Sequence, residues 1–185
     1  MNSEDITEKI ILPGRFKRIY VEKGNGKVFL GGKEINQLDP ENKKYLSLAH
    51  HSDRIKKELN IVKDMVLVTC SGTIGKVALV PEHWNNWTLN QHVMRIVSKE
   101  QYYALIFTWL NSEYGKELIR RQTYGSVVNE ITDKQLGTVV IPVFKKDTIN
   151  NSIISLINKA NELRYKAYKQ EQQAIEIMNR EVLGL

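Results

Sequence analysis

A regular series of apolar and small residues near the C-terminal end constrains the fold of this sequence most. Between Thr148 and Val182 they recur in alternating steps of four and three residues, and no Pro or Gly interrupts the run. The seam positions are Ile149, Ile153, Leu156, Ala160, Leu163, Ala167, Ala174 and Ile177, with Gln170 as the polar member. This pattern predicts one helix with a heptad seam, roughly 50 Å long. Because such a helix cannot bury its seam on itself, it requires a packing partner.

The composition is that of a soluble protein with a moderate excess of positive charge. The chain has 185 residues, 42% of them hydrophobic, and a net charge of +6. This length suits one compact domain plus an appendage. The basic balance is compatible with a polyanionic partner such as DNA or RNA, and equally with solubilising surface charge.

The cysteine count and the N-terminus indicate a cellular compartment. Cys70 is the single cysteine, which excludes an internal disulfide framework and a thiolate-rich zinc site. The first residues, MNSEDITEKI, contain no apolar signal region, and no stretch approaches the length of a membrane span. We therefore expect a soluble cytoplasmic protein with no membrane partner.

Short alternating segments before residue 100 predict β-structure. Residues 1–15 are interpreted as a loosely held lead-in, and the polar segment His50–Lys57 as a loop. The expected strands lie at Phe16–Val21, Val28–Leu30, Tyr45–Leu48, Ile61–Thr69, Val77–Val80 and Leu89–Val97. Their close spacing favours a curved sheet or a barrel-like arrangement over βαβ units.

The pattern changes to helical spacing after residue 100. Helices are expected at Gln101–Leu110 and Lys116–Arg121, divided by Gly115, and a capping box at Thr132–Gln135 begins a further helical turn. Thr138–Ile141 is expected to form a closing strand, and Asp147 to N-cap the long helix. The predicted fold class is α+β: a curved, mostly antiparallel sheet or barrel-like domain (1–145) with short helices, followed by a long coiled-coil helix (147–183).

Catalytic motifs are not found in the sequence. The segment SGTIGK resembles a phosphate-binding loop, but Cys70 and Val77 occupy the positions that require Gly and Ser or Thr, so a hairpin turn is favoured. The four histidines lack metal-ligand spacing, and Cys70 is best interpreted as a small buried hydrophobe. We expect no metal, no bound cofactor and no catalytic residue in this chain.

The remaining candidates are binding residues. Basic, amide and hydroxyl side chains in loops can neutralise phosphates or contact base edges in the major groove, although each can also be an ordinary solvated surface residue. The candidate DNA-binding residues are Lys33, Arg54, Lys56, Lys57, Ser71, Thr73, Lys76, Asn90, Gln91, Tyr124 and Ser126. The candidate helix-partner interface comprises Ile153, Leu156, Ala160, Leu163, Ala167, Gln170, Ala174 and Ile177.

Several segments in order resemble the specificity subunits of type I restriction–modification systems. They are KYLSL, VLVTCSGTIGKVALVP, NQHVMRI, YGSVVNEIT and LGTVVIPV, followed by the long helix with ANELR. Their order and separations are similar to one target recognition domain followed by one helical spacer segment.

The resemblance implies a non-catalytic module that reads double-stranded DNA in the cytoplasm of a bacterium or archaeon. Its implied partners are methyltransferase (modification) subunits, which bind S-adenosylmethionine and methylate adenine, and a restriction/translocase subunit. Self-association through the C-terminal helix is also expected. Three arrangements stay open: a half-length subunit that dimerises, a fragment of a longer subunit, or the recognition module of a fused methyltransferase-endonuclease. A coiled-coil assembly protein whose head domain binds protein is the alternative from another functional class.

Overall fold

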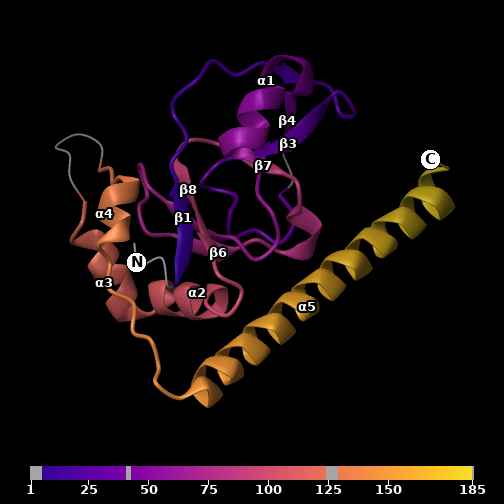
Figure 1. Ribbon diagram of the computed structural model, residues 1–185. Coiled ribbons are helices and arrows are strands. Elements are labelled where there is room, and N and C mark those ends of the chain that lie inside the picture. Colours follow the sequence, from indigo (N-terminus) through magenta and orange to yellow (C-terminus); the bar gives the residue numbers. More distant parts are fainter. Residues whose placement is uncertain (1–5, 41–42, 124–128, 185) are drawn as a thin grey trace.

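A head built on two β-sheets is followed by one long helix (Figure 1). The computed structural model describes residues 6–40, 43–123 and 129–184. The term head denotes its described residues up to Ile141. The predicted α+β class, with a long C-terminal helix, is confirmed. The sheets are not closed into a barrel.

The first sheet has the strand order β1-β8-β5-β6 and is antiparallel throughout. The second has the order β2-β4-β3-β7, in which only the β3–β7 pair is parallel. The bounds are β1 Thr7–Ile11, β2 Tyr20–Val21, β3 Gly26–Leu30, β4 Lys44–Ser47, β5 Val66–Thr69, β6 Val77–Leu79, β7 Thr88–Leu89 and β8 Val93–Ser98. The expected strands from Val28 to Val97 are thus confirmed in outline, and the last of them is divided into β7 and β8.

Short helices cover the sheets, and the longest element extends beside them. The helical elements are α1 Leu48–Arg54, η1 Ile55–Leu59, η2 Glu82–Trp84, α2 Tyr103–Asn111, α3 Glu113–Arg120, α4 Asp133–Gly137, α5 Asp147–Met178 and η3 Asn179–Leu183. The predicted capping box of α4 is present, with Thr132 and Gln135 satisfying each other's backbone N–H groups.

The central strand β5 is buried on both of its faces. Val66 and Val68 pack in the cluster formed with α2, whereas Leu67 between them packs in the cluster that contains Trp84 and Leu89. This alternation follows from the two-residue period of a strand, which sends successive side chains to opposite faces. The strongly apolar run MVLVT therefore lies at the centre of the head. The turns at the ends of β5 and of its neighbouring strands are anchored in this core.

Two segments expected to be irregular are regular. Residues 7–11, interpreted as a loose lead-in, form β1, which pairs with β8. The expected loop His50–Lys57 lies in α1 and η1. Burial of Ile55 and Leu59 stabilises this helical segment, and Arg54 forms an i,i+4 ion pair with Glu58 at 2.8 Å.

Two further expectations are corrected. Thr138–Ile141 belongs to no strand, although Val139 and Ile141 are buried and Val140 between them is exposed. Gly115 lies inside α3 rather than between the helices. A Cβ there would overlap the Trp109 carbonyl oxygen, so glycine permits the close approach of α2 and α3.

The start of the long helix also differs from the expectation, and so does the first predicted strand. Asp147 is the first residue of α5 rather than its N-cap, and Lys146 precedes it without a side-chain capping bond. The strand expected at Phe16–Val21 is reduced to the two residues of β2. The division of the chain into domains at 1–145 and 147–183 stays a prediction.

Candidate functional site

Three loops converge on one cleft, which we call the glycine cleft. They are the segment after β3, the turn between β5 and β6, and the turn before β8. The cleft encloses about 390 Å³. It is lined by Gly31, Gly32, Lys33, Glu34, Thr69, Ser71, Gly72, Thr73, Lys76, Asn90 and His92. The lining includes the buried Thr69, at the end of β5.

The turn between β5 and β6 is built for sharp reversal of the chain. Gly72 and Gly75 have φ values of +75° and +80°, which residues with a Cβ adopt only with strain. The buried Thr69 anchors the turn, because its hydroxyl donates to the Thr73 carbonyl and accepts from the Lys76 N–H at 3.0 Å. The hairpin interpretation of SGTIGK is therefore confirmed, and the turn presents Thr73 and Lys76 to the cleft.

A buried arginine supports the turn before β8. Arg95 is 0% exposed, and its guanidinium donates to four backbone carbonyls. These carbonyls belong to Leu59, Leu89, Asn90 and Val93. Burial lowers the pKa of Arg95 to about 9, so the group is still charged at neutral pH. The positive charge of the Arg95 guanidinium is therefore buried beneath residues 89–93.

Two further side chains, Arg18 and Gln91, form a pair next to the lining residue His92. Arg18 donates through Nη2 to Gln91 Oε1 at 2.8 Å, and its guanidinium lies 5.6 Å from the centroid of the Phe29 ring. Burial lowers the pKa of His92, and the positive charges of Arg18 and Arg15 lower it further. Arg15, Arg18 and Arg95 were not among the sequence candidates. The only sequence signal for Arg95 is a charged residue in an otherwise apolar strand segment, HVMRIV.

The structure brings together about half of the predicted DNA-binding residues. Lys33, Ser71, Thr73, Lys76 and Asn90 line the cleft, and Gln91 lies next to it, between the lining residues Asn90 and His92. Arg54, Lys56 and Lys57 lie instead on α1 and η1 and do not line it. Tyr124 and Ser126 lie outside the described residues. Whether any of these residues contacts DNA stays a prediction.

The described part of the chain holds no arrangement typical of a metal centre. Within it, no group of three or more His, Cys, Asp or Glu side chains is placed to bind a metal ion. Burial raises the pKa of Cys70 to about 12, so its thiol is a poor nucleophile. Among the described helices, none combines the length and apolar character needed to cross a bilayer.

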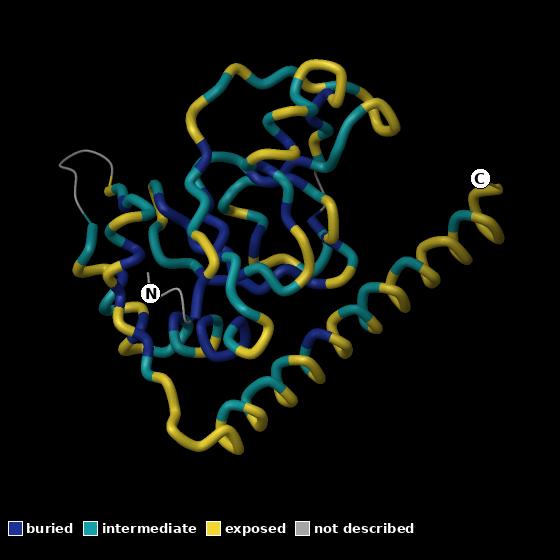
Figure 2. Tube along the Cα trace, viewed as in Figure 1, coloured by how far each residue is buried: buried dark blue, intermediate teal, exposed yellow. Residues whose placement is uncertain are grey.

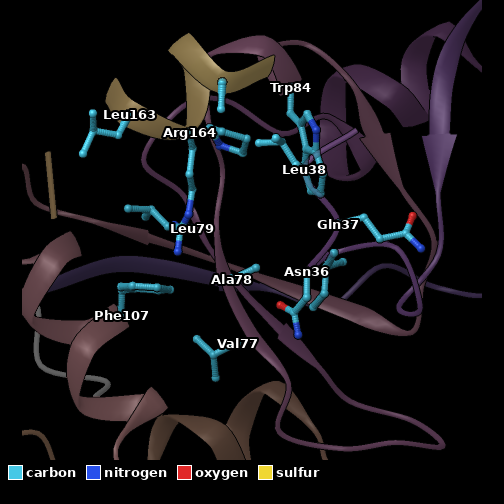
Figure 3. A pocket seen from close by; sticks show the side chains of 13 residues that line it. Asn36, Gln37, Leu38, Val77, Ala78, Leu79, Trp84, Phe107, Leu163 and Arg164 are labelled. Atoms are coloured by element: carbon cyan, nitrogen blue, oxygen red, sulfur yellow. The ribbon is translucent and has the colours of Figure 1, made fainter. Parts of the chain in front are cut away.

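Helix α5 contacts the head through polar and aromatic side chains and through isoleucines of its first turns, which pack against the core. The Tyr168 ring stacks on His83 with centroids 4.2 Å apart, and the Tyr103 hydroxyl donates to the Asn158 side chain. Further along the helix, Gln172 donates to Asp39 at 3.2 Å. A cavity of about 440 Å³ lies between helix and head (Figure 3), where Arg164 extends from α5 toward Leu79.

Several of the predicted seam residues on α5 are exposed, although Leu163 also borders the cavity between helix and head. Leu156 is 68% exposed, Leu163 56% and Ile177 53%, and the alternation of exposed and half-buried residues along α5 is visible in Figure 2. Gln170 and Ala174 are also exposed. Ile153, Ala160 and Ala167 are half-buried, and Ile153 packs at the edge of the core beneath α2. The seam thus leaves an apolar stripe that the head does not cover.

Comparison with protein-family models identifies the family of this chain. The model described as the type I restriction modification DNA specificity domain matches residues 20–176, which is most of the chain. The chain belongs to this family. The resemblance seen in the sequence motifs is thereby confirmed. A search of curated protein sequences gives no significant match.

Solved structures of specificity subunits share the fold of this specificity domain. The type I restriction-modification S subunit from M. genitalium has 15% identity and a TM-score of 0.52, over 96% of this chain and 43% of that structure. The HsdS subunit from Thermoanaerobacter tengcongensis has 18% identity and a TM-score of 0.56, over 89% and 37% respectively. A chain of a type I R-M system solved for its complex assembly and conformational transition has 16% identity and a TM-score of 0.56, over 94% and 41%. The present chain spans less than half the length of each.

Proposed function

We propose that this specificity domain recognises a DNA sequence for a DNA adenine methyltransferase or restriction complex and is itself non-catalytic. The observation that carries the proposal is the gathering of Lys33, Lys76 and Asn90, from three separate loops, around one cleft. Family membership supports this function over a coiled-coil assembly protein with a protein-binding head. In this proposal S-adenosylmethionine is bound by the methyltransferase subunit.

The charges at the glycine cleft favour a phosphate backbone as the ligand. Within the described residues, neither Lys33 nor Lys76 has an ion-pair partner, whereas Arg54 is paired with Glu58. The rim carboxylates are already engaged. Glu34 accepts from the Gly31 N–H at 2.9 Å, and Glu130 accepts from Ser71 and from Arg15. The two lysines are therefore available to neutralise phosphates, while the amide side chains reach base edges.

The exposed stripe of α5 is proposed as the docking surface for another helix. Leu156, Leu163 and Ile177 follow the heptad spacing that a facing helix recognises, and Ala160 and Ala167 permit close approach. At 1.5 Å per residue α5 is roughly 48 Å long, about the length of 14 base pairs. A second copy of this chain, the other half of a longer subunit, or a modification subunit all fit this surface. A restriction/translocase subunit joining the same complex is part of the proposal.

Salt-dependent DNA binding tests the proposed function. Gel-shift titration of the full chain, with and without its methyltransferase subunit, should select particular duplexes from a random pool. Lys33→Ala or Lys76→Ala should weaken binding to all duplexes alike and reduce the salt slope by about one, because each removes one phosphate contact. Lys159→Ala on α5 is the matched control and should leave both unchanged. Absence of sequence preference with the methyltransferase subunit present would refute the proposal.

Light scattering tests the stripe. Changing both Leu156 and Leu163 to Lys should reduce the mass of any self-associated form to that of a monomer, because two charges would be buried in the seam. The matched control changes the exposed polar residues Ser155 and Gln173 to Lys, which should leave the mass unaltered. A wild-type chain that is monomeric at high concentration would exclude self-association, and co-purification of the methyltransferase subunit would then test the other partner.

A further inference from the structure

Arg18 and Gln91 form a pre-ordered pair beside the glycine cleft. Arg18 comes from the segment before β2 and Gln91 from the turn before β8, so the pair joins the two sheets. The guanidinium lies over the Phe29 ring, which is only 6% exposed and therefore provides a fixed platform. The hydrogen bond between Nη2 and Oε1, at 2.8 Å, then fixes the position of one side chain relative to the other.

The backbone carbonyls of Gln91 and of the two residues before it all accept hydrogen bonds from side chains. The Gln91 carbonyl accepts from the Cys70 thiol, and the carbonyls of Leu89 and Asn90 accept from the buried Arg95. On the side chain, Nε2 lies 3.1 Å from His92 Nε2. Both members of the pair thus occupy defined positions before any ligand arrives. Such ordering reduces the side-chain entropy lost on binding.

The neighbouring amide side chain has a different role. Asn90 Oδ1 accepts from the His92 N–H at 2.9 Å, which closes the turn on itself. Its acceptor is therefore used to shape the turn. Of the two adjacent amides, Gln91 is the one whose side chain is directed toward Arg18.

The chemistry of the pair matches base edges better than phosphates. A neutral amide neutralises no phosphate charge, but its donor and acceptor match adenine N7 and N6. A guanidinium fork matches guanine O6 and N7. Because the two side chains are hydrogen-bonded to each other, their remaining donors and acceptors lie close enough together to contact neighbouring base pairs. We propose that Arg18 and Gln91 are the specificity-determining pair of this domain, with Arg18 reading guanine and Gln91 reading adenine on the adjacent base pair. This inference rests on the proposed function.

Selection from duplexes with a randomised core tests the inference. The wild-type chain, in complex with its methyltransferase subunit, should enrich a motif that contains neighbouring G·C and A·T pairs. Arg18→Ala should lower discrimination at the G·C pair by about 5- to 150-fold, and Gln91→Ala should do so at its neighbour. Arg18→Lys should keep most of the affinity but lose the same guanine preference, because an ammonium lacks the planar fork. Lys33→Ala is the control that should weaken binding without changing the motif.

The outcomes separate this inference from the proposed function. If Arg18→Ala and Arg18→Lys leave the enriched motif unchanged, Arg18 is a phosphate contact or a structural residue, and the inference is overturned while the proposed function stands. If the wild-type complex enriches no motif, the proposed function fails and the inference fails with it. Far-ultraviolet circular dichroism and urea unfolding of each variant establish that any loss of discrimination occurs in a folded protein.

Discussion

Replacing Arg95 by Met probes the least expected feature of the head. Met is similar in length and apolar, so it fills the space of the side chain without its charge. The substitution removes the donors of four backbone carbonyls, those of Leu59, Leu89, Asn90 and Val93. Asn90 keeps one partner, because its carbonyl also accepts from the Val93 N–H. The remaining oxygens lose a charged donor in a region that solvent does not reach.

The magnitude follows from two opposing effects. An orphaned buried polar group costs about 1–3 kcal/mol, so the carbonyls together would lose about 3–9 kcal/mol. Removing a buried cation relieves a desolvation penalty of several kcal/mol, which offsets part of that loss. We expect a net decrease of about 2–5 kcal/mol in the free energy of unfolding, a large share of the 5–15 kcal/mol that is typical of a domain.

Urea unfolding followed by tryptophan fluorescence measures this change. The midpoint should fall for Arg95→Met with an unchanged m-value, and Arg95→Lys should be intermediate because one nitrogen cannot replace both ends of the fork. The exposed Arg121→Met is the matched control and should change stability by less than about 0.5 kcal/mol. If Arg95→Met is as stable as the wild type, desolvation outweighs the carbonyl bonds, and the argument that Arg95 supports the turn is refuted.

Three smaller perturbations test other parts of the head. Cys70, whose pKa burial raises to about 12, should resist a disulfide reagent at about pH 8 in the native protein and react fully in denaturant. His83 has a pKa lowered by burial from 6.5, so the unfolded chain binds a proton more readily than the folded one as pH falls below 6.5. The urea midpoint should therefore decrease between about pH 7.5 and about pH 5.5, and by less in His83→Gln; an equal decrease would exclude His83 as a cause. Thr132→Ala should lower the free energy of unfolding by about 1 kcal/mol by removing the cap of α4, and an unchanged midpoint would show that the cap contributes nothing.

Elements with a strong local pattern were predictable from the sequence. The apolar run that contains β5, the hairpin turn at Gly72 and Gly75, and the capping box at Thr132 each carry their own signal within a few residues. The long helix α5 belongs to the same class, since its heptad seam continues over the whole element. In these places local propensity and tertiary packing favour the same structure.

Other elements depend on contacts that no local pattern contains. The segment TEKII becomes β1 only because β8, far along the chain, offers an unpaired edge. Conversely, Val139 and Ile141 are buried and alternate with the exposed Val140 as a strand would, yet this segment belongs to neither sheet of the described residues. An alternating sequence pattern indicates that one side of a segment is buried. It does not by itself show that the segment forms the backbone hydrogen bonds of a strand.

The sequence predicted which loops contribute to the candidate site, but not which side chains contact one another there. Lys33, Lys76 and Asn90 carry the composition expected of a binding loop, and the fold gathers them in one cleft. Arg18 and Arg95 had no such signal. One lies in a segment that reads as a half-buried strand, and the other lies inside an apolar strand with no acidic partner nearby in sequence. A buried arginine compensated by carbonyl groups becomes visible only when the backbone that surrounds it is known.

The two faces of α5 explain how one helix can serve the head and a partner together. Most of the heptad seam is exposed, whereas Asn158, Tyr168 and Gln172 contact the head, and the seam residue Ile153 packs against its core. Because these polar and aromatic contacts involve specific geometry, they fix the direction of the helix relative to the glycine cleft while Leu156 and Ile177 stay exposed. Occupation of the stripe therefore need not displace the head. A partner that docks there would inherit a fixed orientation to the cleft, which is what a spacer between recognition and modification requires.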